Sequence, residues 1–140
     1  MNATNWPRII MCGLIVGVVF TLLSAVLVGL VGSEFLAAAG PGAAGTGPGL
    51  YFATVLAGMW AMWLYAVVRP QVPGNPAAVI TVSLAWWLIA GLQSAKWVLL
   101  LDLPLSAVLP LAGNVVPTGI AVLVGSVLYE RVGPARPLHP

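Results

Sequence analysis

Few side chains in this sequence combine the chemical type and the spacing that a functional site needs. Gln93 and Asn114 are the deepest polar residues of two long apolar stretches, and Ser24 lies at a similar depth in a third. Gln93 and Asn114 each lie roughly eight residues from the end of their stretch, or about 12 Å in a helix that rises 1.5 Å per residue. The sequence therefore predicts a shared polar layer, with Gln93 and Asn114 as an interhelical hydrogen-bond pair.

This polar layer has a structural and a functional interpretation. Neutral amides without an ionisable neighbour usually hold membrane helices together, and such a hydrogen bond contributes about 0.6–2 kcal/mol. The functional alternative is a ligand for a substrate or for a metal-containing pigment. We expect the structural role, and we keep a small channel or transporter with a polar site around Gln93 and Asn114 as the alternative function.

Two prolines lie on either side of Asn114. Pro110 and Pro117 each lack a backbone N–H and free the carbonyl that the N–H would bind. Freed carbonyls build ion sites in some transporters, but kinked helices are also ordinary in membranes, where neighbours satisfy the backbone. We predict a kink here and no ion site.

The sequence lacks the residues that most kinds of active site require. Cys12 is the single cysteine, which excludes an intrachain disulfide and a cysteine-pair redox centre. The single histidine, His139, lies in the C-terminal tail, away from where a haem or chlorophyll ligand is needed. No serine–histidine pair, aspartate pair or zinc site is available for an intramembrane protease. Residues 9–32 also lack the acidic residue on which small multidrug transporters rely. We expect a non-catalytic protein with no cofactor and no metal.

The elements that position these residues are four apolar stretches, at about residues 9–32, 50–68, 77–101 and 106–129. Each is close to the roughly 20 residues that a helix needs to cross the hydrocarbon core. The composition agrees, since 6% of the residues are charged, against about 25% in soluble domains.

The connections between the stretches predict how the helices pack. Residues 33–48 are rich in Gly and Pro, which favours a loop. The two later connections are short, so sequential helices must pack antiparallel. The prediction is an all-α polytopic membrane protein, with residues 1–140 forming one domain, a bundle of four transmembrane helices.

The few charges predict the orientation and exclude one class of partner. The net charge of +2 comes from residues spread along the chain, which does not indicate a nucleic-acid surface. Lys96 lies toward one side of the membrane with Glu34 and Asp102, and four arginines lie on the other. By the positive-inside rule both termini are cytoplasmic. Four arginines to one lysine, with abundant Ala, Gly, Pro and Val, favour a bacterial protein, and we expect it in the inner membrane. The four arginines are Arg8, Arg69, Arg131 and Arg136.

Small residues predict where the helices pack closely. Gly13 and Gly17 are four residues apart near the start of the first stretch, a spacing that lets two backbones approach. Ala57 belongs to an alanine stripe on the second stretch, and Gly91 and Gly125 have small neighbours four residues away on the third and fourth.

The tryptophans divide into two groups by depth. Trp60, Trp86 and Trp87 fall near the middle of the membrane, whereas the other three suit its interfaces. The mid-membrane group predicts aromatic packing within the bundle or contact with lipid. The alternative is a platform for a partner helix or a flat cofactor.

The ends of the second and fourth stretches resemble each other. Residues 64–70 and 128–134 share Leu, Tyr, Val and Pro in register. One interpretation is duplication of a helical hairpin, as in transporters built from repeats. The other is that both helices leave the membrane at the same interface, where such residues are common.

Residues 63–79, with the sequence WLYAVVRPQVPGNPAAV, carry a family resemblance. The segment resembles a stretch of small bacterial four-helix membrane proteins of unassigned function, in which a helix ends in Tyr, a basic–Pro pair and a Gly/Pro turn. The Gly13–Gly17 start and the Leu128–Tyr129 ending are similar too, but the basic residue expected after Pro70 is missing. The resemblance implies the architecture only. We expect an accessory or scaffold subunit that packs against lipid or other membrane proteins, with a respiratory or photosynthetic complex as a candidate host.

Overall fold

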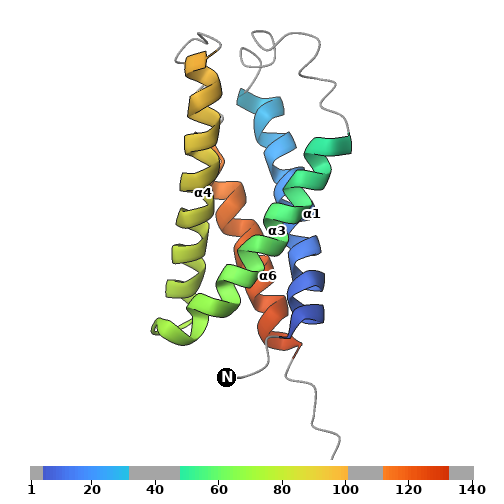
Figure 1. The fold of residues 1–140 in the computed structure, drawn as a ribbon, viewed down its shortest axis with the longest axis vertical. Helices are drawn as coiled ribbons and strands as arrows, with labels where there is room; N and C mark the ends of the chain where they lie inside the picture. The colour runs from blue at the N-terminus through green and yellow to red at the C-terminus, as the bar shows by residue number, and fades with distance from the viewer. Residues whose placement is uncertain (1–4, 32–47, 101–111, 133–140) are drawn as a thin grey trace, which may run out of the picture.

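The chain folds into helices packed side by side along one long axis (Figure 1). The structure is a computed structural model and describes residues 5–31, 48–100 and 112–132. All regular structure in these residues is helical, which confirms the all-α prediction. The elements are α1 (Trp6–Val31), α3 (Pro48–Val68), the 3₁₀ turn η1 (Arg69–Gln71), α4 (Asn75–Leu100) and α6 (Val115–Arg131).

The start of α1 is set by a side-chain cap. The backbone N–H of Arg8 donates to Oδ1 of Asn5 at 3.3 Å, and the N–H of Ile9 donates to the Asn5 carbonyl at 3.1 Å. An asparagine that satisfies these otherwise free donors favours a helix start, and Pro7 fits the first turn because it needs no donor there. The helix therefore begins three residues before the predicted apolar stretch, at Trp6.

A tight connection joins α3 to α4. The turn after η1 contains Gly74, whose φ of +82° is a conformation that favours glycine. Beyond the turn, α4 continues as a helix past Lys96 to Leu100. The predicted loop at 33–48 lies outside the described residues, except for Pro48, which begins α3.

The backbone before α6 is interrupted at Asn114. Residues 112–113 are helical, Asn114 forms a turn, and α6 begins at Val115. Pro117 has no N–H to donate to the carbonyl of Gly113, which accounts for an interruption at this point. The ladder resumes with the N–H of Thr118, which donates to the Asn114 carbonyl at 3.0 Å. Pro110 and the rest of segment 101–111 lie outside the described residues.

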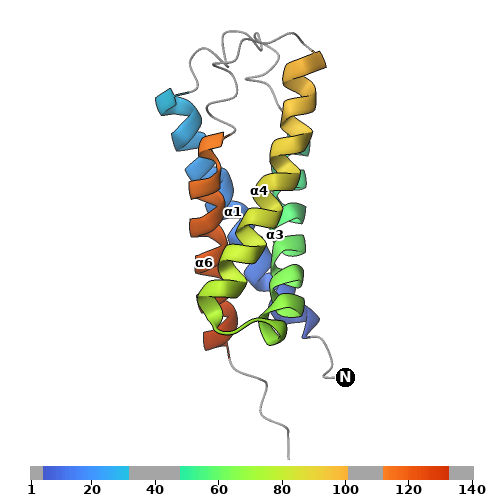
Figure 2. The ribbon, with the colours of Figure 1, turned by 90° about the vertical axis from the view of Figure 1, so that its left-hand side faces the viewer.

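The four α-helices of the described residues form a ring in the order α1, α3, α4, α6. Helix α1 packs on α3 and α6, and α4 packs on α6 and α3. Figures 1 and 2 show that α1 and α4 begin at the end of the bundle where α3 and α6 finish. Sequential helices are therefore antiparallel, as the short connections predict.

Three helices of the described part are long and apolar enough to cross a membrane. These segments are Trp6–Leu30, Phe52–Gln71 and Asn75–Leu92. Their outward faces carry large apolar side chains, such as Leu22 at 63% and Leu30 at 77% exposure. Exposed apolar surface on this scale is typical of lipid contact. The prediction of a membrane protein is confirmed at this level.

The closest packing in the bundle is between α1 and α3. A Cβ atom built on Gly17 would lie 2.7 Å from the Cα of Val55, and one built on Gly58 would lie 2.8 Å from the Cα of Gly17. Gly13 meets the backbone of Met59 in the same way. The two backbones can approach this closely only because all three positions lack a side chain.

Candidate functional site

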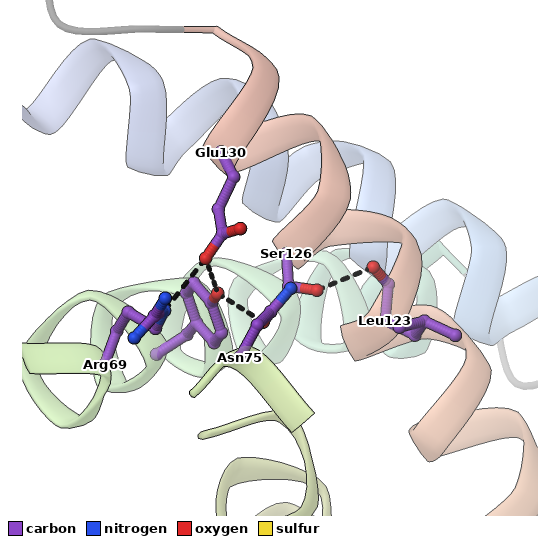
Figure 3. A network of polar contacts seen from close by, with 6 residues as sticks. Arg69, Asn75, Leu123, Ser126 and Glu130 are labelled. Carbon is purple, nitrogen blue, oxygen red and sulfur yellow. Dashed lines mark hydrogen bonds and ion pairs between the residues drawn. The ribbon is translucent and has the colours of Figure 1, made fainter. Parts of the chain in front are cut away.

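Polar side chains gather at the end of the bundle where α1 and α4 begin. We call this group the polar end cluster, and it draws on α1, α3, α4, α6 and η1. Figure 3 shows the part of it around Arg69, Asn75 and Glu130. Every member has a polar or aromatic contact with another member. The cluster consists of Arg8, Tyr65, Arg69, Asn75, Tyr129 and Glu130.

Tyr65 is the centre of the cluster. Its ring is fully buried, and its hydroxyl lies 2.7 Å from Oδ1 of Asn75 and 3.0 Å from Oε1 of Glu130. One hydroxyl proton can serve only one of these acceptors at a time. Rotating the Asn75 amide by 180° lets its NH₂ donate to the tyrosine oxygen while the hydroxyl donates to Glu130. In either arrangement Tyr65 connects α3 to both α4 and α6.

An ion pair adds a second connection between α6 and the end of α3. Nε of Arg69 lies 2.8 Å from Oε1 of Glu130, the same oxygen that accepts from Tyr65. The hydrogen bond from Arg69 is the main reason why the pKa of the Glu130 carboxyl lies below its usual value of 4.5. The Arg69 side chain is 36% exposed and the Glu130 side chain is 40% exposed. Water screens such an exposed pair, so its contribution to stability is small.

Aromatic contacts join α1 to the same cluster. The guanidinium carbon of Arg8 lies 4.0 Å from the centroid of the Tyr129 ring, a cation–π geometry. Tyr129 meets Tyr65 edge to face, with centroids 5.7 Å apart and an interplanar angle of 79°. A continuous chain of contacts therefore runs from α1 through α6 and α3 to α4.

The contacts of the cluster connect the helices. The Glu130 carboxylate and the Tyr65 hydroxyl are both hydrogen-bonded to side chains of other elements. Among the described residues, no group of three or more His, Cys, Asp or Glu side chains is placed to hold a metal ion. The arrangement fixes the relative positions of the four helix ends.

The predicted polar layer lies in the opposite half of the bundle. Ser24 and Asn114 are half-buried, and within the described residues neither Oγ of Ser24 nor Oδ1 of Asn114 has a hydrogen-bond partner. A Cβ atom built on Gly113 would lie 3.2 Å from Leu27, which puts the Asn114 turn beside the part of α1 one turn beyond Ser24. Gln93 lies on α4, but its side chain is outside the described part. The pair of Gln93 and Asn114 therefore stays a prediction.

The predicted packing positions have different surroundings. A Cβ atom on Gly125 would overlap Val16 of α1 and lie 2.6 Å from the sulfur of Met62, so this glycine lies in a tight contact. Ala57 packs against the core, but its neighbour Gly58 makes the closest approach to α1. Gly91 faces open space as far as the described residues extend. Sequence reasoning missed Gly58, although it is the only glycine in residues 50–68.

The three mid-membrane tryptophans also differ. Trp86 is 5% exposed and packs against Phe20 of α1, with ring centroids 4.8 Å apart and an interplanar angle of 36°. Trp87 is half-buried and engaged with neighbours, whereas Trp60 points outward at 37% exposure. Trp86 thus fills the interior between α4 and α1, where its ring face is already used.

The polar end cluster was not predicted as a site. The sequence comparison of residues 64–70 with 128–134 did single out both tyrosines, but it gave no indication that they touch. Arg69 and Glu130 are 61 positions apart, and their pairing depends on how α3 and α6 pack.

No family model, curated protein or solved structure matches this chain.

Proposed function

We propose that this chain is a non-catalytic integral membrane protein, an accessory or scaffold subunit that packs against lipid and other membrane proteins. The observation that carries the proposal is the use of the polar groups. The Glu130 carboxylate binds both the buried Tyr65 and Arg69 in the polar end cluster, and the guanidinium of Arg8 lies over the ring of Tyr129. A site for chemistry or transport needs polar groups that remain available to a substrate.

Three hydroxyls elsewhere in the helices are also bonded within the protein, whereas Oγ of Ser83, like the polar atoms of Ser24 and Asn114, has no partner among the described residues. The hydroxyls of Thr21, Thr118 and Ser126 donate to carbonyls of their own helices, at 2.7–2.8 Å. Figure 3 includes the bond from Ser126 to the Leu123 carbonyl. Hydroxyls that bond back to the helix offer little to a polar substrate.

The proposed topology has four spans with both termini in the cytoplasm. α6 has 17 residues, and the uncharged segment of residues 106–114 before it supplies the remaining length for a fourth span. Arg8, Arg69 and Arg131 belong to the end of the bundle where α1 begins (Figure 1). The positive-inside rule assigns that end to the cytoplasmic side, in a bacterial inner membrane.

One observation favours the alternative of a small channel or transporter. Ser24 and Asn114 have buried polar atoms without a partner among the described residues, beside the helix interruption. Unsatisfied groups at a broken helix resemble the ion sites of transporters. The test is a flux assay in liposomes, in which Asn114→Leu abolishes the flux of a transporter while its fold is retained.

The proposed function is tested by extracting tagged protein from native membranes under mild conditions, and then identifying the proteins and recording the absorption spectrum of the particle. A fixed ratio of this chain to the subunits of one complex is the expected result. A monodisperse preparation of this chain alone that turns over or transports a substrate contradicts the proposal.

A pair of variants then locates the contact on the particle. Trp60→Ala with Trp63→Ala changes the outward face of α3, and Leu84→Ala with Leu88→Ala makes a matched change on the outward face of α4. Loss of the other subunits with one pair and retention with the other identifies the helix that the host complex contacts.

A further inference from the structure

We propose that the bundle consists of two copies of one helical hairpin, α1–α3 and α4–α6, related by a two-fold axis that runs along the bundle. The inner face of each hairpin is then a self-complementary interface whose partner is the other hairpin. In such an isologous interface, a residue on the axis touches its own equivalent. The inference does not depend on the proposed function.

The first support is the direction of the hairpins. α1 and α4 begin at the same end of the bundle, and α3 and α6 finish there (Figures 1 and 2). The ring order α1, α3, α4, α6 puts the two hairpins side by side, with α1 against α6 and α3 against α4. A two-fold axis along the bundle exchanges these two interfaces, as parallel repeats in membrane proteins require.

The second support is the register of α3 and α6. Tyr129 follows Tyr65 by 64 positions, and the same shift aligns identical residues along both helices. It also aligns the buried glycine and alanine pair of Ala61 and Gly125. The identical pairs are Thr54 and Thr118, Ala57 and Ala121, Leu64 and Leu128, Tyr65 and Tyr129, and Val68 with Val132, which directly follows α6.

The third support is the burial pattern of α1 and α4. With a shift of 66 positions, four of the five buried residues of α1 align with buried residues of α4, and the fifth, Ile9, aligns with the half-buried Asn75. The outward residues Leu14, Val18 and Leu22 align with outward residues of α4 in the same way. The buried pairs are Cys12 and Ala78, Gly13 and Val79, Val16 and Val82, and Gly17 and Ser83.

The fourth support is that equivalent aromatic residues touch. The register of α3 and α6 makes Tyr65 and Tyr129 equivalent, and their rings meet edge to face at 5.7 Å. The independent register of α1 and α4 makes Phe20 and Trp86 equivalent, and their rings pack at 4.8 Å. Two self-equivalent contacts, at the polar end and farther inside, define the position of one axis.

The two halves have diverged where one of them packs more tightly. The α1–α3 crossing is built on Gly13, Gly17 and Gly58. The equivalent positions of the other hairpin carry Val79, Ser83 and Val122, whose side chains hold α4 and α6 farther apart. The axis therefore relates the arrangement of the helices and the order of their buried positions rather than every side chain.

The first test exchanges the members of an axial contact in the full chain. Phe20→Trp alone overfills the contact and Trp86→Phe alone leaves a void, so each lowers the midpoint of thermal unfolding by about 3–8 °C. The double exchange returns the midpoint to within about 2 °C of the wild type, because the two-fold axis gives positions 20 and 86 equivalent surroundings. The matched control exchanges an off-axis contact, Val16→Gly with Gly125→Val, and stays destabilised. A double exchange at 20 and 86 that is as unstable as the two single changes combined overturns the proposal.

The second test uses disulfide cross-linking and does not depend on that exchange. The axis maps the contact of Val16 with Gly125 onto a contact of Val82 with Ala61. In a Cys12→Ala background, the cysteine pairs at 16 and 125 and at 61 and 82 are expected to cross-link to a similar extent. A pair at 61 and 84 is the control, since Leu84 faces outward. Cross-linking at 16 and 125 without cross-linking at 61 and 82 overturns the two-fold relation.

Discussion

Gly58 is the position where a small change has the most decisive expected effect. In an exposed helix, Gly→Ala stabilises by about 1 kcal/mol, because alanine lowers the conformational entropy of the unfolded chain. At Gly58 the added methyl group would lie 2.8 Å from the Cα of Gly17 and would also overlap the carbonyl oxygen of Gly13. We therefore expect Gly58→Ala to destabilise the bundle, with the opposite sign to the ordinary effect.

The magnitude follows from which atoms must move. Carbon atoms in contact normally lie about 3.5–4.0 Å apart, so α1 and α3 have to separate by roughly 1 Å. The obstructing atoms of Gly13 and Gly17 are backbone atoms, which cannot rotate away. A gap of this size forfeits about a quarter to a half of each pairwise dispersion energy along the crossing. Overfilling a packed contact lowers stability by about 1–3 kcal/mol in total. The steric strain itself is larger than this total, because the helix propensity of alanine offsets up to about 1 kcal/mol of it.

The assay is chemical or thermal unfolding in detergent micelles, followed by far-ultraviolet circular dichroism. Gly29→Ala and Gly119→Ala are matched controls, since a Cβ at either position meets nothing within 4 Å among the described residues. Both controls are expected to be neutral or stabilising. A Gly58→Ala protein at least as stable as the wild type would refute the close crossing of α1 and α3.

Three further predictions concern the polar end cluster and the interior. Tyr65→Phe removes the hydroxyl that lies between Asn75 and Glu130 and should lower the free energy of unfolding by about 1–2 kcal/mol in urea titrations, with unchanged helix content. The lowered pKa of Glu130 means that its stabilising effect is complete above pH 4.5 and is lost as the pH falls below that value. The loss amounts to about 1 kcal/mol or less for this partly exposed group, and a Glu130→Gln protein that keeps the same acid-induced loss would argue against the assignment. Trp86→Ala should cost about 3–5 kcal/mol by leaving a cavity, whereas the outward Trp60→Ala should cost less than 1 kcal/mol in the same unfolding assay.

The helices and their membrane character could be predicted from the sequence because both follow from local composition. Long uncharged stretches must satisfy their backbone groups internally, and only helices or closed barrels do so in lipid. The close crossing of α1 was also visible locally, as Gly13 and Gly17 four residues apart. The start of α1 at Trp6 depends on the cap at Asn5, a single residue that the apolar pattern does not register.

The inward faces were harder to predict, for a physical reason. In a soluble helix the apolar face marks the core, but these helices are apolar all round, so hydrophobicity does not separate inside from outside. The sequence predicts a similar depth in the membrane for Trp60 and Trp86, yet Trp60 faces outward and Trp86 fills the interior. In lipid, small residues indicate the packed face of a helix better than hydrophobicity does. On α3 the residue that makes the close approach is Gly58, whereas the prediction named its neighbour Ala57.

In the polar end cluster, the polar contacts do not follow the proposed two-fold arrangement of the helices. On the proposed axis, Tyr65 and Tyr129 are equivalent, but only Tyr65 lies between an amide and a carboxylate. The ring of Tyr129 instead packs against the guanidinium of Arg8, so Tyr129 connects α6 to α1. Two identical residues thus join different pairs of helices, and the cluster reaches all four helix ends without a repeated set of polar partners. Because Glu130 accepts from both Tyr65 and Arg69, its replacement should weaken the contact of α6 with α3 while the Arg8–Tyr129 contact between α1 and α6 persists.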